Sequence, residues 1–202
     1  MERGCGRLME MTIPVTDAST ATRILDVAER LAQTRGFNGF SYADIATELG
    51  LTKASLHYHF PTKADLGEAL IDRYACRFAD ALGAVEQRRV GAQAAVETYV
   101  ELYAAVLRGD RMCLCGMLAA EYETLPAPMQ AAVRRFFDTS EAWLESVLEG
   151  GRVDGAFHFA GSAREEARLL LGGLEGAMLI ARSYGDQARF GVVADRLVAG
   201  LV

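Results

Sequence analysis

Apolar residues recur every three to four positions along most of the chain, which is the spacing of amphipathic helices and not the alternation of strands. Glycine and proline punctuate this pattern. The first segment, about 19–34, carries Ile24, Ala28 and Leu31 on one stripe and is followed by Gly36, where a left-handed C-terminal cap suits glycine. We therefore predict an all-α fold.

Two short helices follow, and their starts are marked by cap residues. Ser41 and Asp44 have the spacing of a capping box at the start of a helix over 42–49. Thr52 is a good N-cap for a second helix, 53–59. Two short helices joined by a tight glycine-containing turn, after a longer supporting helix, predict a helix-turn-helix.

The rest of the chain predicts six more helices with the same apolar spacing. They span about 63–84, 91–108, 113–124, 127–149, 163–183 and 187–201. Glycine inside a helix costs about 1 kcal/mol relative to alanine, so the glycines of the last two helices indicate close packing. We predict that these two helices form the four-helix seam of a two-fold dimer. The expected contacts are Leu169, Gly173, Leu174, Ala177, Ala181, Leu197 and Leu201.

Charge and composition narrow the class of protein. The chain has 202 residues, of which 51% are hydrophobic, so it can bury a substantial core. Its net charge of −6 argues against a basic face that coats nucleic acid or membrane, so any anion site must be local. Both lysines and two of the three histidines fall within 52–63. This stretch is the candidate anion site.

Neither a targeting segment nor a disulfide framework is evident. The four cysteines, at positions 5, 76, 113 and 115, lack framework spacing, and the N-terminus lacks the apolar stretch of a signal peptide. No apolar segment reaches the roughly 20 residues that a bilayer span requires. We expect a cytoplasmic protein without membrane insertion. The start codon stays open between Met1, Met9 and Met11.

The helix over 53–59 carries groups that suit a DNA major groove. Leu56 and Phe60 are four apart and can face the core, while its polar residues project from other faces. Lysine and histidine can donate to phosphates or guanine edges, serine can bond to either, and Ala54 permits close approach. His57 and His59 do not face each other at i and i+2, so we predict no metal site and no cofactor.

A family resemblance emerges from these residues. Its segments are Gly36-Phe37, Ser41-Tyr42-Ala43-Asp44-Ile45-Ala46, Leu49-Gly50, Thr52 to Phe60 and Thr62-Lys63-Ala64-Asp65-Leu66. Together, over about 22–70, they resemble the DNA-binding domain of TetR-family transcriptional regulators. The family implies all-helical subunits of about nine helices that form homodimers. The implied divisions are a flexible arm (1–18), a three-helix DNA-binding domain (19–66) and a larger effector-binding and dimerisation domain (67–202).

The resemblance also implies which residues contact DNA. By position these are Tyr42, Lys53, Ala54, Ser55, His57, Tyr58, His59 and Lys63. Tyr42, His59 and Lys63 would mainly bind phosphates, whereas Lys53, Ser55 and His57 are better placed to read bases. Many members have tyrosine where His57 stands. An unperturbed histidine titrates at about pH 6.5, so the base preference and the pH dependence of DNA binding stay open at this position.

A second, shorter resemblance concerns Met112 to Glu121 (MCLCGMLAAE). It resembles the Gly-Cys-Leu…Leu-Ala-x-Glu segment of a TetR subset, some of whose members respond to electrophiles through that cysteine. Cys113 is the matching position, and Met112 replaces the usual glycine. A helix N-terminus favours a thiolate, which fits redox sensing. The alternative is that Cys113 and Cys115 are small buried hydrophobic residues.

Aromatic and sulfur-containing side chains in the C-terminal region are candidates for an effector pocket, because such pockets are mostly apolar with a few polar groups. We predict a hydrophobic or electrophilic effector. The candidate lining is Tyr99, Tyr103, Cys113, Met117, Tyr122, Phe136, Phe137, Trp143 and Met178.

These features predict a transcriptional repressor and not an enzyme. Its dimer would place two recognition helices on a palindromic site in double-stranded DNA, and a small effector would release it. A thiol enzyme based on Cys113 and Cys115 would need a base, yet His158 has no motif around it. A cysteine-based sensor, a transcriptional activator and a structural DNA-binding protein without an effector stay open as alternatives.

Overall fold

The computed structural model describes residues 19–202, so the predicted arm 1–18, Cys5 and the question of the start codon lie outside it. Within these residues the regular structure is entirely helical, which confirms the predicted all-α class. The elements are α1 (Thr20–Arg35), α2 (Tyr42–Leu49), α3 (Lys53–His59), α4 (Lys63–Gln87), α5 (Ala92–Arg108), α6 (Leu114–Ala120), the 3-10 turn η1 (Tyr122–Thr124), α7 (Ala127–Val153), α8 (Ala163–Tyr184) and α9 (Ala188–Ala199).

The predicted caps set the short helices of the N-terminal region. Ser41 and Asp44 form a reciprocal capping box at the start of α2, and Gly50 ends the helix with a φ of 65°. The Thr52 hydroxyl accepts the Ser55 amide at 3.2 Å at the start of α3. These bonds satisfy amides that have no partner within their own helix, so the helices begin where the sequence predicts.

One predicted helix ends early. The segment 113–124 was expected to be continuous, but α6 ends at Ala120 and the chain turns through η1. The turn begins at Glu121, whose carboxylate accepts the Phe37 amide at 2.6 Å. The contact joins residues far apart in sequence, so the local apolar pattern cannot reveal it.

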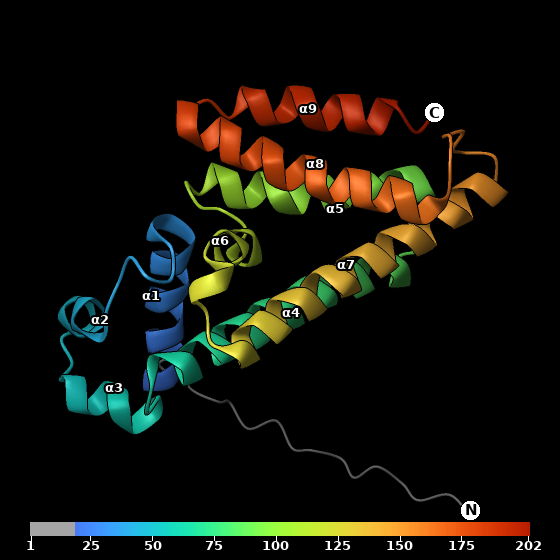
Figure 1. Ribbon diagram of the computed structural model, residues 1–202. Helices are drawn as coiled ribbons and strands as arrows, with labels where there is room; N and C mark the ends of the chain where they lie inside the picture. The colour runs from blue at the N-terminus through green and yellow to red at the C-terminus, as the bar shows by residue number, and fades with distance from the viewer. Residues whose placement is uncertain (1–18) are drawn as a thin grey trace, which may run out of the picture.

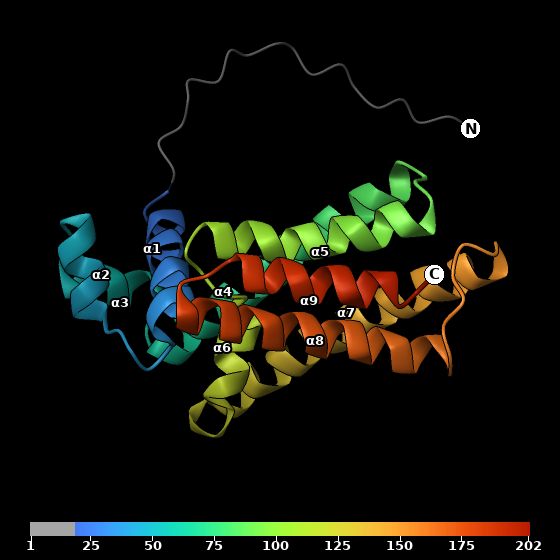
Figure 2. The same ribbon diagram turned by 90° about the horizontal axis from the view of Figure 1, so that it is seen from above.

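The helices form a small group at one end and a larger body beside it. Figure 1 shows α1, α2 and α3 together at one end, with α4 running from this group alongside α7. Figure 2, the view from above, shows α5, α9 and α8 lying side by side over the body. Helix α8 packs on both α7 and α9. Thus α4 begins in the helix-turn-helix and continues through the body.

Helices α4 and α7 approach closely at Gly67. A Cβ atom at this position would lie 2.5 Å from Met129 Cε and 2.9 Å from Phe37 Cζ, closer than packed atoms allow. The N-terminal part of α4 therefore packs tightly between α7 and Phe37, which follows the end of α1.

The predicted dimer contacts require a correction. Leu174, Ala177, Ala181 and Leu201 are buried within the subunit itself, leaving almost no surface for a partner. Gly173 lies against Leu197, because a Cβ atom there would be 2.7 Å from Leu197 Cδ1. These residues join α8 to the core and to α9 inside one subunit. Of the predicted contacts, Leu169 is a large exposed hydrophobic residue.

None of the helices in the described part of the chain is long and apolar enough to cross a membrane. Over the same residues, histidine, cysteine, aspartate and glutamate side chains form no group suited to a metal ion.

Candidate nucleic-acid interface and ligand cavity

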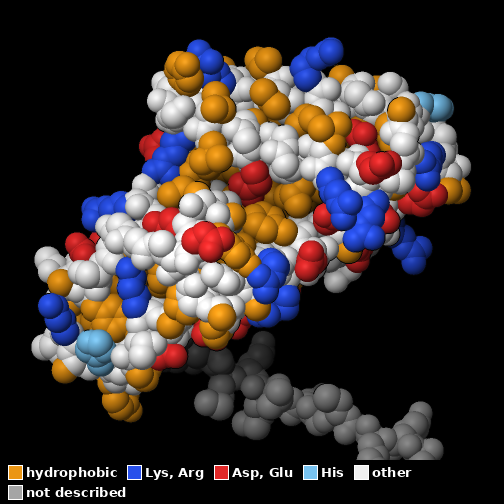
Figure 3. Space-filling view, viewed as in Figure 1, with side chains coloured by type: hydrophobic (Ala, Val, Ile, Leu, Met, Phe, Trp, Pro, Cys, Tyr) orange, Lys and Arg blue, Asp and Glu red, His pale blue; other side chains and the backbone are white. Residues whose placement is uncertain are grey.

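Helix α3 exposes most of the residues that were predicted to contact DNA. Leu56 is fully buried and anchors the helix, while Lys53, Ala54 and His57 are exposed. Ser55 and His59 are half-buried, and the Tyr58 side chain is 84% exposed. Figure 3 shows basic and histidine side chains at the end of the molecule where α2 and α3 lie. The surface is available to a ligand and carries several donors.

Tyr42 does not belong to this surface. Its side chain is buried, and its hydroxyl lies 2.7 Å from the carbonyl oxygens of both Phe60 and Thr62. Burial, together with the charge of Asp65, raises the pKa of Tyr42 to about 12. The hydroxyl therefore joins α2 to the α3–α4 turn. We therefore expect a structural role for Tyr42 in place of the predicted phosphate contact.

Lys63 is also engaged internally. Its ammonium donates to the carbonyl oxygens of Phe37 and Phe40, each at 2.5 Å, and lies 4.6 Å and 4.4 Å from the centroids of their rings. Burial lowers its pKa, while Glu121 and Asp44 oppose that effect. Since two of its three donors are already used, Lys63 holds the α1–α2 turn, and we expect this structural role in place of the phosphate contact.

His57 is oriented by its surroundings. Its Nδ1 lies 3.0 Å from the Pro61 carbonyl oxygen, and its ring packs 4.8 Å from the Tyr42 ring. A carbonyl oxygen only accepts, so Nδ1 carries the hydrogen in this contact. The other ring nitrogen, Nε2, remains for a partner outside the subunit.

Two contacts hold the turn after α1 to the body. The Glu121 carboxylate accepts the amides of Phe37, at 2.6 Å, and Asn38, at 3.3 Å. The Asn38 side-chain amide donates to the Thr124 hydroxyl at 2.7 Å. The turn is thus fixed by the segment that follows α6.

The C-terminal end of α1 is held from the other side by α8. The Arg182 guanidinium donates to the carbonyl oxygen of Gln33 at 2.8 Å and to that of Thr34. Gln33 exchanges two hydrogen bonds with the backbone of Met112, of 3.0 Å and 3.2 Å. An arginine at the carbonyl end of a helix is favoured by the helix dipole.

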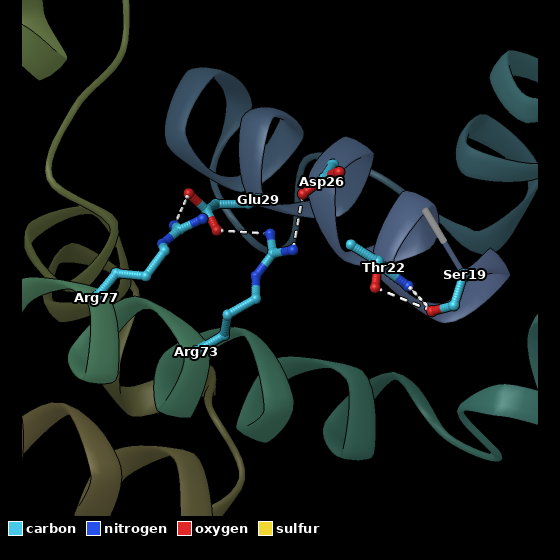
Figure 4. Close-up of polar contacts among 6 residues, drawn as sticks. All are labelled: Ser19, Thr22, Asp26, Glu29, Arg73 and Arg77. Atoms are coloured by element: carbon cyan, nitrogen blue, oxygen red, sulfur yellow. Dashed lines mark hydrogen bonds and ion pairs between the residues drawn. The ribbon is translucent and has the colours of Figure 1, made fainter. Parts of the chain in front are cut away.

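Ion pairs connect the middle of α1 to α4, as Figure 4 shows. Arg73 contacts Asp26 at 2.7 Å and Glu29 at 2.8 Å, and Arg77 contacts Glu29 at 2.5 Å. The Glu29 side chain is only 8% exposed. A carboxylate this buried needs its partners, because an unpaired buried charge is strongly destabilising.

A cavity of about 150 Å³, partly open to the surface, lies between α4 and α5. Of the predicted effector contacts, Tyr103, Cys113 and Met178 line it. The complete lining is Tyr74, Arg77, Phe78, Ala81, Leu102, Tyr103, Val106, Cys113 and Met178. The contribution of α4 was missed, although residues 74, 77, 78 and 81 have the spacing of one helix face.

The other predicted effector contacts lie outside this lining. Tyr99 is fully buried and stacks on Trp143, with ring centroids 5.7 Å apart. The Tyr122 hydroxyl is bound by Arg134, and Phe137 packs against Phe136. Met117 lies on α6 near Arg182. Tyr99 and Trp143 form an aromatic layer behind Tyr103, whose ring is 5.4 Å from that of Tyr99.

The two cysteines of the Met112 to Glu121 segment are buried. Cys113 is the N-cap of α6, as its position near a helix start predicts. Burial and the charge of Glu175 raise the pKa of both Cys113 and Cys115 well above the ordinary value. Their thiols are therefore held in the neutral, less nucleophilic form.

Sequence reasoning missed Glu175 on α8. Its Oε1 atom is buried without a hydrogen-bond partner in residues 19–202. Burial raises the pKa of this carboxyl to about 7, although Cys113 and Tyr103 favour its charged form. A Cβ atom on Gly116 would collide with Glu175 Oε2, so a glycine leaves room for the carboxylate.

The fold and the exposed α3 define a helix-turn-helix protein with a cavity in its larger body. Residues 24–70 match the family described as bacterial regulatory proteins, tetR family. The transcriptional regulator TtgR of Pseudomonas putida is 40% identical over 53 residues, which are 26% of this chain. The match spans only 25% of TtgR.

Two crystal structures extend the similarity to almost the whole chain. A TetR-family transcriptional regulator from Agrobacterium tumefaciens is 32% identical with a TM-score of 0.88, over 91% of this chain and 98% of its own. A TetR transcriptional regulator from Legionella pneumophila is 32% identical with a TM-score of 0.85, over 93% and 100%. The chain belongs to the TetR family. It is accordingly a DNA-binding transcriptional regulator and not an enzyme.

Proposed function

We propose that the protein is a cytoplasmic repressor that binds a palindromic operator as a two-fold dimer and leaves it when a small molecule enters the cavity. Residues 19–66 serve as the DNA-binding domain, with Lys53, Ser55 and His57 reading bases and Ala54, Tyr58 and His59 close to the DNA. Residues 67–202 bind the effector and dimerise, and 1–18 form an arm. Tyr42 and Lys63 support this surface from within.

The apolar outer face of α8 and α9 supports a dimer. Its large exposed hydrophobic residues are Leu169, Leu179, Ile180, Tyr184, Val192 and Val193. A groove of about 620 Å³ runs between the two helices beside Ile180 and Val192. Contiguous exposed apolar surface of this kind is typical of protein interfaces. Two copies of the α8–α9 pair would bury it as a four-helix bundle.

The observation that carries the proposal is the double placement of Arg77. This residue lines the cavity and also binds Glu29 of α1. A ligand that displaces Arg77 or its neighbour Phe78 therefore acts on α4 and on α1 together. A tenfold loss of DNA affinity requires only about 1.4 kcal/mol of differential binding between two conformations.

Filling the cavity tests the proposal. The operator is first located by footprinting on the protein's own genome, and effectors are found by their ability to release it. In the half-buried cavity wall, Ala81→Leu should retain operator binding but lose release by the effector. Ala84→Leu, on an exposed position of the same helix, is the matched control. Unchanged release in Ala81→Leu would contradict effector binding at this site.

We propose non-covalent release in preference to electrophile sensing by Cys113. The raised pKa of its thiol and its burial both disfavour the reactive thiolate. If Cys113→Ser abolishes release by an electrophile that acts on the wild type, the cysteine mechanism replaces this part of the proposal. Whether the bound protein blocks or assists transcription depends on the position of its operator relative to the promoter.

A further inference from the structure

The Glu175 carboxyl group has no positive partner in the body. No ion pair formed within 19–202 includes it, and its Oε1 has no hydrogen-bond partner there. Buried carboxylates are normally paired or hydrogen-bonded, because desolvation of an isolated charge is costly. The lack of a positive partner within the protein therefore bears on the charge of the ligand that the site binds.

Glu175 adjoins the cavity through two of its lining residues. The Tyr103 hydroxyl and the Cys113 thiol lie close enough to the carboxylate to favour its charged form, and both side chains face the cavity. Met178, one turn along α8 from Glu175, lines the cavity as well. The field of the carboxylate thus reaches the cavity through low-dielectric surroundings, where it is weakly screened.

Aromatic rings form much of the cavity wall. The Phe78 ring lies 6.4 Å from Tyr74 and 6.2 Å from Tyr103, and all three side chains face the cavity. The faces of such rings attract cations, with a strength that grows when water is excluded. Aromatic faces beside an unpaired carboxylate are the complement of an organic cation.

Three arginines of α4 and α8, Arg73, Arg77 and Arg182, do not supply the missing charge. The Arg77 guanidinium binds Glu29, and the pairs that Arg73 forms with Asp26 and Glu29 balance the charges of this group. The Arg182 guanidinium binds carbonyl oxygens at the end of α1. None of the three forms an ion pair or a hydrogen bond with Glu175.

We infer that the cavity takes a lipophilic organic cation, such as an aromatic quaternary ammonium, held by the faces of Tyr74, Phe78 and Tyr103 and by the charge of Glu175. The inference rests on the proposed function, because it names the chemical class of the effector. The experiment distinguishes such a cation from an anionic aromatic ligand, which Arg77 on the cavity wall would favour.

Three probes of similar shape but different charge distinguish a cationic ligand from an anionic one. Phenyltrimethylammonium, tert-butylbenzene and benzenesulfonate each carry a benzene ring with a tetrahedral head, and their charges are positive, zero and negative. Their binding to the full-length protein is measured by calorimetry at pH 8, because burial raises the pKa of the Glu175 carboxyl to about 7. Fluorescence of Trp143, the single tryptophan of the chain, reports occupancy near the aromatic layer.

The cation should bind at least about tenfold more tightly than the neutral probe, and the anion more weakly than either. Glu175→Gln should abolish this preference while leaving the affinity for tert-butylbenzene within about twofold. Glu166→Gln, a second half-buried glutamate on α8, is the matched control and should keep the preference. Glu175→Asp retains the charge and should restore part of it. Thermal unfolding confirms that each variant is folded.

The outcomes separate this inference from the proposed function. Equal or tighter binding of tert-butylbenzene or benzenesulfonate, or a cation preference that survives Glu175→Gln, overturns the cation assignment and leaves a ligand cavity in place. The absence of binding by all three probes also overturns it. Failure of the proposed function is seen independently, as the absence of operator binding by the unliganded protein.

Discussion

The Arg77 guanidinium, on the wall of the cavity, binds the buried Glu29 carboxylate of α1 at 2.5 Å. This ion pair, together with that of Arg73, is the polar connection between the middle of the first helix and α4. A residue that touches the ligand space also holds the supporting helix of the helix-turn-helix. Substitutions in this ion pair therefore test the connection between the cavity and α1 directly.

Glu29→Gln should lower the free energy of unfolding by about 2 kcal/mol, because it leaves Arg77 without a charged partner and removes one partner of Arg73. It should also weaken the coupling between ligand and DNA. Urea unfolding measures the first effect. Glu48→Gln, which breaks an exposed pair with Arg30, is the control and should cost less than about 1 kcal/mol. Equal effects of the two substitutions would rule out a special role for Glu29.

The two lysines should differ in their effects on DNA binding. Lys53→Ala should reduce the slope of log affinity against log salt by about 1, because it removes an exposed positive charge that lies against the DNA in the proposed complex. Lys63→Ala should leave that slope unchanged and lower the melting temperature, because the carbonyls of Phe37 and Phe40 lose their donor. Salt titrations and thermal melts of both variants make the comparison. A reduced slope in Lys63→Ala without loss of stability would restore its predicted phosphate contact.

Glu175 should make stability depend on pH. Its carboxyl has an ordinary pKa of 4.5 and burial raises it to about 7, so between these values the folded state holds a proton that the unfolded state releases. The contribution is favourable at low pH and is lost as the pH rises through 7. Relative to the wild type, Glu175→Gln should gain at most about 3 kcal/mol between pH 4 and 8. A constant difference across this range would show that the carboxyl is well solvated.

The outer face of α8 should control dimerisation. Ile180→Asp places a charge on the exposed apolar face and should produce folded monomers, detected by analytical ultracentrifugation and circular dichroism. Leu174→Asp, on the buried face of the same helix, should unfold the subunit instead, because it buries an unpaired charge. Dimers of Ile180→Asp as stable as the wild type would place the interface elsewhere.

Local signals were enough to predict the helices. Capping residues such as Ser41 and Thr52 act within three residues of their partners, so the sequence alone locates the starts of α2 and α3. The limits of α4 and α7 were less accurate: the helices extend to Gln87 and Val153, beyond the predicted ends at 84 and 149. Helix ends without strong caps depend on packing.

Long-range contacts explain why the sequence does not reveal the surroundings of several residues. Tyr42 and Lys63 have suitable chemistry for phosphate binding, but their partners are 18 to 26 residues away in the sequence and occupy them. Helix α8 has apolar residues on two faces, and its sequence does not reveal that Leu174 faces its own subunit. Glu175 became notable only when the fold placed it beside Tyr103 and Cys113.

Footprinting of the protein on its own genomic DNA tests the central claim most directly. If two α3 helices read a palindrome, the protected site should contain two inverted half-sites whose centres are about 10 base pairs, or a multiple of it, apart. Lys53→Ala should weaken protection of both half-sites equally. Protection of a single unrepeated half-site, or full protection by Lys53→Ala, would contradict the account.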